Sequence, residues 1–114
     1  MLYHALSGFF YFMGYSKIRQ AYIREAKLKG RHTEKEWILL KEFFSNKCVV
    51  CDGINQKWIE KDHIIPISKG GCDSIKNIQP LCQFCNQSKG NNSNEDFRIK
   101  MAEAIGKTLP SIFK

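Results

Sequence analysis

Four cysteines in two pairs of identical spacing are the side chains of this sequence best suited to bind a metal ion. Cys48 and Cys51 form one pair and Cys82 and Cys85 the other, each with two residues between them. Two thiolates at this spacing can bind one ion, and two such pairs complete a tetrahedral Zn²⁺ site. Because four protein ligands fill the coordination sphere, we expect this zinc to be structural. Two disulfides or four unrelated thiols are the alternatives.

The 30 residues between the two pairs, 52–81, exceed what a simple zinc ribbon uses, which indicates a functional insert. The fifth cysteine, Cys72, lies in this insert without a partner at ligand spacing, and we interpret it as a spare thiol. The insert and the second cysteine pair carry an ordered series of polar residues and glycines: Asp62, His63, Gly70, Gly71, Asn77, Asn86 and Lys89.

This series resembles the HNH endonucleases of the ββα-metal class, in the zinc-bearing form where two cysteine pairs bracket the site. The similar stretch is residues 48–90, and the spacing of His63, Asn77 and Asn86 is similar to that of the HNH domain of RNA-guided CRISPR nucleases. The stretch 30–37 also resembles the lead-in of small phage-type HNH proteins. The resemblance implies an α+β fold, with a ββα-metal core, a four-Cys zinc site and flanking N- and C-terminal helices.

The resemblance also implies a role for each polar side chain in hydrolysing a DNA phosphodiester bond. His63 would be the general base that takes a proton from water, since imidazole is largely neutral at pH 7. Asp62 and Asn86 would hold a catalytic Mg²⁺ or Mn²⁺ through oxygen atoms. The family often has histidine at this last position, and Asn86 is a neutral donor instead. Asn77 would form a hydrogen bond near His63 and fix its ring, and Lys89, one helical turn after Asn86, would point toward phosphate.

Local geometry and commoner structural roles compete with this interpretation. Adjacent strand residues point to opposite faces, so Asp62 and His63 can share a site only at a strand end or a bulge. Taken singly, His63 would more often be a core histidine, Asn77 a turn residue, Asn86 a helix cap and Lys89 a solvated lysine. Their joint order between two cysteine pairs favours the catalytic interpretation.

Positive charge is concentrated in one segment that precedes the cysteines. The chain has 18 Lys and Arg against 11 Asp and Glu, a net charge of +7, and five of the seven excess charges lie in residues 17–31. A helix here could lie along nucleic-acid phosphates, or it could be an ordinary solvated face. The basic residues are Lys17, Arg19, Arg24, Lys27, Lys29 and Arg31.

Periodicity and turn residues predict the elements that position these side chains within one domain of 114 residues. Helices are expected over 16–29, with Ile18, Tyr22 and Ala26 on one apolar stripe, and from a capping box at Thr33 to about residue 46. A strand over 58–67, a return strand over 77–81 and a helix over 82–89 form the 48–90 core. The C-terminal part, 91–114, should hold a helix with Ser93 as its cap and its end at Gly106.

The N-terminal segment 1–15 holds six of the 14 aromatic residues. We favour a segment docked on the core, and the alternatives are a partner-binding patch, a membrane-surface anchor or a start placed too early. Its apolar stretch is shorter than the roughly 20 residues of a membrane span, and the first basic residue, Lys17, follows it, unlike in a signal peptide. We therefore expect a cytoplasmic protein of a bacterial or phage-infected cell.

The leading interpretation is a metal-dependent endonuclease that nicks or cuts double-stranded DNA. A non-catalytic, zinc-stabilised DNA-binding module is the main alternative, and an adaptor built on Phe9–Phe12 is the third. A homodimer or a phage packaging partner would be compatible with the leading interpretation.

Overall fold

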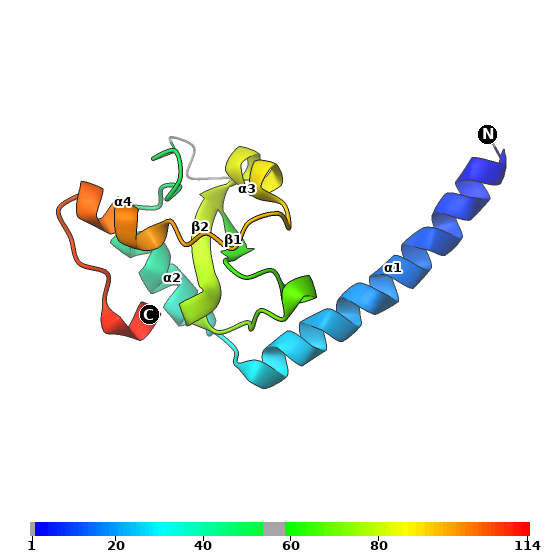
Figure 1. Ribbon diagram of the computed structural model, residues 1–114, viewed down its shortest axis with the longest axis horizontal. Helices are drawn as coiled ribbons and strands as arrows, with labels where there is room; N and C mark the ends of the chain where they lie inside the picture. Colours follow the sequence, from blue (N-terminus) through cyan, green and yellow to red (C-terminus); the bar gives the residue numbers. More distant parts are fainter. Residues whose placement is uncertain (1, 54–58) are drawn as a thin grey trace.

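The computed structural model describes the main chain of residues 2–53 and 59–114 and the side chains of residues 16–53 and 59–114. Its helices and strands follow in the order α1 (Leu2–Lys29), α2 (Glu34–Phe43), β1 (Ile59–His63), β2 (Ile78–Cys82), α3 (Gln83–Lys89) and α4 (Arg98–Ala104). Strands β1 and β2 form an antiparallel sheet, and α3 follows β2 without a loop and contacts both strands (Figure 1). The predicted α+β class with a ββα core is therefore confirmed.

The register of the two strands decides which face each side chain of β1 occupies. Asp62 pairs with Gln79, and His63, the last residue of β1, pairs with Ile78. The Lys61 ammonium lies 5.7 Å from the centre of the Trp37 ring on α2, whereas the Asp62 carboxylate contacts Lys89 on α3. Because adjacent strand residues point to opposite faces, α2 and α3 cover opposite sides of the sheet.

Helix α2 begins where its capping box predicts. Glu36 N donates to Thr33 Oγ1 (3.0 Å), and Thr33 N donates to Glu36 Oε1 (2.8 Å). These bonds satisfy N–H groups that a helix start leaves without an internal partner. The helix then buries Trp37 and Leu40 in the core. The core consists of Trp37, Leu40, Phe44, Cys48, Val49, Ile75, Ile78, Leu81, Cys85, Ala102, Leu109 and Phe113.

Helix α1 is longer than predicted and leads away from the rest of the molecule (Figure 1). Its C-terminal end contacts the 3₁₀ turn Ile67–Lys69 and buries Ala26. Of the predicted apolar stripe only Ala26 is buried, whereas Ile18 and Tyr22, farther toward the N-terminus, are 56% and 39% exposed. The side chains of residues 2–15 lie outside the described part, so their docking stays a prediction. No helix among the described residues is long and apolar enough to cross a bilayer.

The predicted start of the last helix at Ser93 is also wrong, since α4 begins at Arg98. Gln79 on β2 binds the segment that precedes α4: its Nε2 donates to Glu95 O (3.1 Å) and its Oε1 accepts from Phe97 N (3.0 Å). The Ser93 hydroxyl accepts from Glu95 N in a local turn instead of capping a helix. The helix ends at Ala104, and Gly106 follows with φ of 74°, close to the predicted stop.

Candidate functional site

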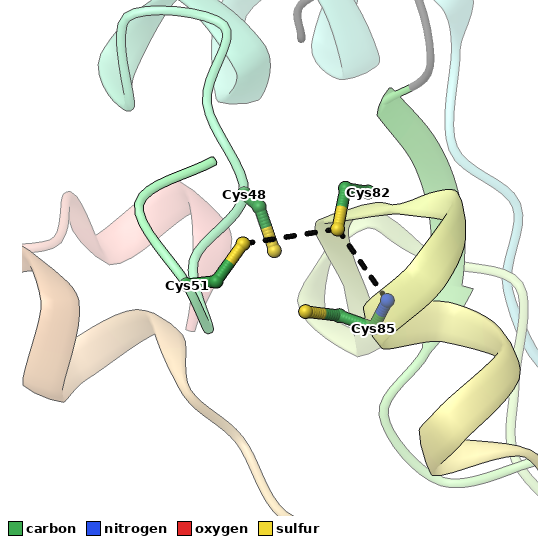
Figure 2. A group of neighbouring side chains, drawn as sticks. All are labelled: Cys48, Cys51, Cys82 and Cys85. Atoms are coloured by element: carbon green, nitrogen blue, oxygen red, sulfur yellow. Dashed lines mark hydrogen bonds between the residues drawn. The ribbon is translucent and has the colours of Figure 1, made fainter. Parts of the chain in front are cut away.

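The four paired cysteines converge into one cluster (Figure 2). Their Sγ atoms all lie within 4.8 Å of one another, and Cys51 Sγ is 3.8 Å from Cys82 Sγ. Val49 N donates to Pro80 O (3.0 Å), which places the turn of the first pair beside the strand that carries the second. All four are free thiols, so two disulfides are not formed here.

The cluster has the chemistry and the dimensions of a tetrahedral metal site. Zinc–sulfur bonds of about 2.3 Å in a tetrahedron place the sulfurs about 3.8 Å apart, the distance between Cys51 and Cys82. Burial, together with the neighbouring thiols, raises the pKa of Cys85. Burial opposes ionisation at Cys48 too, yet backbone N–H groups, including that of Val50, lower its pKa. A bound cation would stabilise all four as thiolates, so the donor set fits a metal such as zinc.

A polar pocket of about 160 Å³ lies at the end of β1. Asp62 and His63 line it from β1, Asn86 from α3 and Arg19 from α1. Asp62 and His63 share this pocket without a bulge in β1. His63 is the last residue of the strand, and the two side chains border the pocket from opposite faces. The structure thus brings together three of the five polar residues that the sequence singles out.

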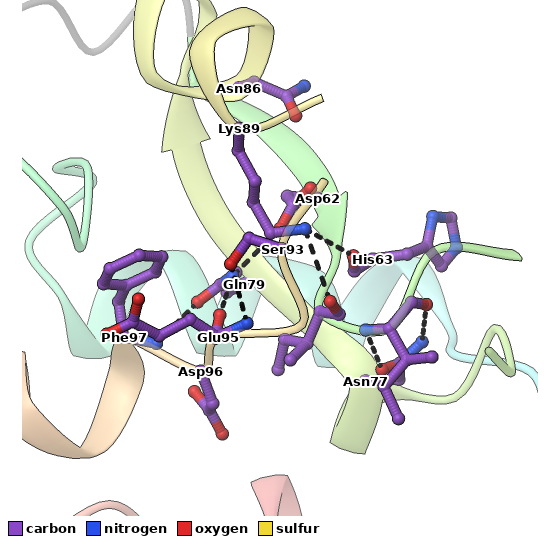
Figure 3. A network of polar contacts seen from close by, with 12 residues as sticks. Asp62, His63, Asn77, Gln79, Asn86, Lys89, Ser93, Glu95, Asp96 and Phe97 are labelled. Atoms are coloured by element: carbon purple, nitrogen blue, oxygen red, sulfur yellow. Dashed lines mark hydrogen bonds and ion pairs between the residues drawn. The ribbon is translucent and has the colours of Figure 1, made fainter. Parts of the chain in front are cut away.

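Asp62 is buried, and its carboxylate belongs to a network of polar contacts beside the pocket (Figure 3). Its Oδ2 accepts from Gln79 Nε2 (2.9 Å) and lies 3.3 Å from Lys89 Nζ. Both of these contacts are made through one oxygen, so Oδ1 is the atom that can serve a ligand in the pocket.

Lys89 corrects the prediction that this lysine points toward phosphate. Its side chain is only 5% exposed, and besides pairing with Asp62 it donates to the carbonyl oxygens of His63 (3.2 Å) and Ile64 (3.3 Å). An ammonium has three N–H donors, and these three contacts occupy them. Lys89 therefore ties α3 to the end of β1, and it is neither a phosphate ligand nor a solvated lysine.

The ring of His63 is held by a residue that the sequence did not single out. His63 Nε2 lies 2.8 Å from Asp73 Oδ1, and both side chains are only partly exposed. The side-chain hydrogen bonds of Asn77 go to main-chain atoms and not to the ring. Asn77 donates through Nδ2 to the carbonyls of Ile65 (3.0 Å) and Cys72 (2.8 Å) and accepts from Ile65 N (2.9 Å), so it shapes the loop after His63 rather than the ring itself.

Asn86 is oriented by a second unexpected carboxylate. Its Nδ2 donates to Glu60 Oε1 (2.8 Å), two residues before Asp62 on the same face of β1. With the amide nitrogen so engaged, the Oδ1 atom of Asn86 is the donor atom left for a cation.

Part of the chain matches a known protein family. Residues 48–102 match the family model described as HNH endonuclease. These residues, just under half of the chain, are similar to the HNH endonuclease family. The chain is similar to the "SPbeta prophage-derived putative HNH endonuclease YoqL" of Bacillus subtilis (strain 168), at 30% identity over 92 residues. That match covers 65% of this chain but 40% of the relative, and no solved structure matches the chain.

Six basic residues that precede the candidate site in the sequence lie on α1 or just after it. All six predicted nucleic-acid contacts on and after α1 are exposed: Lys17, Arg19, Arg24, Lys27, Lys29 and Arg31. Arg19 lines the pocket beside His63, whereas Lys29 Nζ donates to Gly70 O (3.0 Å) and so helps to fasten the helix to the core.

The second glycine of the Gly70-Gly71 pair is required for a steric reason. A Cβ at Gly71 would overlap the carbonyl oxygen of Ile65 and lie 2.9 Å from Asn77 Nδ2. Only glycine lets the two loop segments approach closely enough for Asn77 to bind both.

Sequence reasoning missed Asp73 and Glu60, the two carboxylates that contact His63 and Asn86. Asp73 lies in the loop between Gly71 and Asn77, and its position after a Gly-Gly step was a usable signal. Glu60 had a signal too, because strand periodicity places it on the face of Asp62.

Proposed function

We propose that this protein is a metal-dependent endonuclease that hydrolyses phosphodiester bonds of double-stranded DNA. The observation that carries the proposal is the pocket at the end of β1, where Asp62, His63 and Asn86 meet beside Arg19. An imidazole, two oxygen donors and a guanidinium supply a base, a cation site and a phosphate contact.

His63 serves as the general base in this proposal. Its ring takes a proton from water, the resulting hydroxide attacks phosphorus, and the bond from phosphorus to the leaving oxygen breaks. Arg19 binds phosphate oxygens from the α1 side. Asn77 maintains the loop that follows the base.

Asp62 through Oδ1 and Asn86 through its amide oxygen would hold Mg²⁺ or Mn²⁺. Such an ion, when bound, stabilises the negative charge that develops on the phosphate. Lys89 keeps the Asp62 carboxylate in place from the opposite oxygen. The cluster of Cys48, Cys51, Cys82 and Cys85 would hold a structural Zn²⁺, which fixes the start of α3 and with it Asn86.

The exposed basic residues of α1 would bind the DNA backbone next to the pocket. One copy has one such pocket and would nick. Cutting both strands in one event needs a second site, from a homodimer or a phage packaging partner. We place this activity in the cytoplasm of a bacterial or phage-infected cell, in line with the prophage origin of the similar protein.

Incubation with supercoiled plasmid at low salt tests the proposal. We expect relaxed or linear product with Mg²⁺ or Mn²⁺, none with EDTA, and none from a zinc-loaded His63→Ala variant. DNA binding without any cleavage would favour the alternative, a non-catalytic zinc-stabilised DNA-binding module.

A further inference from the structure

A single carboxylate, that of Asp73, lies between two histidine rings. Its Oδ1 is 2.8 Å from His63 Nε2 and 3.6 Å from His32 Nδ1. His32 Nδ1 also lies 2.7 Å from the main-chain oxygen of Asp73. The side chains of Asp73 and His32 are only 15% and 9% exposed. These contacts are therefore shielded from competition by water.

The contact with Asp73 decides which ring nitrogen of His63 can act as a base. An ionised carboxylate only accepts hydrogen bonds, so Nε2 must carry the hydrogen. In the neutral ring the lone pair then lies on Nδ1, the nitrogen available to water in the pocket. The opposite tautomer would leave the carboxylate without a donor.

The main chain around Asp73 is itself fixed from two sides. Asp73 N donates to Gly30 O (3.0 Å) and Ala26 O (3.3 Å) at the end of α1. On the other side, Asn77 Nδ2 binds the carbonyl of Cys72 (2.8 Å). The carboxylate is held in place before substrate arrives, as a residue that orients a general base must be.

We propose that Asp73 is a positioning residue for His63, and that His32 secures Asp73 from the far side. Asp73 holds the His63 ring in its Nε2–H form, with Nδ1 directed to the water that is to be deprotonated. His32 links this carboxylate to the segment that follows the basic helix. The inference rests on the proposed nuclease function, since it assigns a partner to the proposed base.

Cleavage kinetics of zinc-loaded, full-length variants test the inference. Asp73→Ala should lower kcat by about 10- to 100-fold, the size of effect that a misplaced catalytic group produces. Its KM for plasmid should stay within about twofold of wild type, because Asp73 holds the base and not the DNA. His32→Ala should lower kcat by a smaller factor.

Ser74→Ala is the matched control in the same loop. The Ser74 hydroxyl accepts from Lys76 N (3.3 Å) and does not contact His63. Its removal should change kcat less than about twofold. An Asp73→Ala protein with the same kcat as Ser74→Ala would overturn the inference.

Proton NMR of the His63 ring gives a readout that does not depend on cleavage. The hydrogen-bonded Nε2–H should give a slowly exchanging downfield signal in wild type and in Ser74→Ala, and this signal should vanish in Asp73→Ala. A signal that persists in Asp73→Ala would contradict the assignment. If Asp73→Ala fails to bind zinc or to melt cooperatively, the isosteric Asp73→Asn replaces it; a reduced kcat supports the inference and a wild-type kcat overturns it.

The nuclease function and the positioning role of Asp73 are distinguished by different outcomes. If the wild-type protein shows no cleavage that depends on His63, both the nuclease function and the positioning role are refuted. If the wild-type protein cleaves DNA and Asp73→Ala is equally active, only the positioning role is refuted.

Discussion

Replacing Lys89 with methionine should destabilise the protein, because it leaves a buried carboxylate without its cation. The Lys89 and Asp62 side chains are 5% and 6% exposed, and their charged atoms are 3.3 Å apart. Removing one partner of a buried ion pair costs about 3–5 kcal/mol. The carbonyls of His63 and Ile64 lose a donor as well. Methionine keeps the apolar stem, so the loss reports the ammonium group and not the packing.

Urea unfolding of zinc-loaded protein measures this effect. We expect the midpoint to fall in Lys89→Met with an unchanged slope, and to stay within experimental error in Lys100→Met, an exposed lysine on α4. The double variant Asp62→Asn/Lys89→Met should lose less stability than the two single variants lose together, since the residues are in contact.

The same variants separate the structural role of Lys89 from a phosphate contact. If Lys89 were a phosphate ligand, Lys89→Met would reduce the slope of log K for DNA binding against log salt concentration by about one. It would leave the free energy of unfolding unchanged. A Lys89→Met protein with wild-type stability and weakened DNA binding would refute the argument from burial.

Three further changes test other parts of the site. Cys85→Ser should lose bound zinc and cooperative melting, whereas the control Cys72→Ser should keep both. Atomic emission measures the zinc content and thermal melts measure the cooperativity, and zinc retained by Cys85→Ser would contradict the four-ligand site. Arg19→Ala should slow cleavage about tenfold and reduce the slope of log K for DNA binding against log salt concentration by about one. An unchanged slope would show that Arg19 does not contact a phosphate. Glu60→Ala should raise the Mg²⁺ concentration needed for half-maximal cleavage about 10-fold or more, because it frees the amide on α3; an unaltered Mg²⁺ titration would count against this.

Features set by neighbouring residues were predictable from the sequence. The two Cys-x-x-Cys pairs predict the cluster because ligand spacing is local, and the Thr33–Glu36 box predicts the start of α2 for the same reason. The order of Asp62, His63 and Asn86 predicts their meeting in one pocket through the resemblance to the HNH family.

Features that depend on strand register or distant partners were not predictable. Lys89 binds Asp62 only because α3 follows β2 and lies against β1, a contact between residues 27 positions apart. The start of α4 moves from Ser93 to Arg98 because Gln79, on β2, binds the segment between them. The sequence places Asp73 in the loop after Gly71, but its contact with His63 depends on the conformation of that loop, which Asn77 holds through the carbonyl of Cys72.

The most direct test of the central claim is metal-dependent plasmid cleavage by wild type and His63→Ala, prepared with equal zinc content. The proposed mechanism predicts relaxed or linear DNA from wild type with Mg²⁺ or Mn²⁺, and supercoiled DNA alone from His63→Ala and from the EDTA control. Equal cleavage by both proteins, or none by a wild-type protein that binds the plasmid, would contradict it.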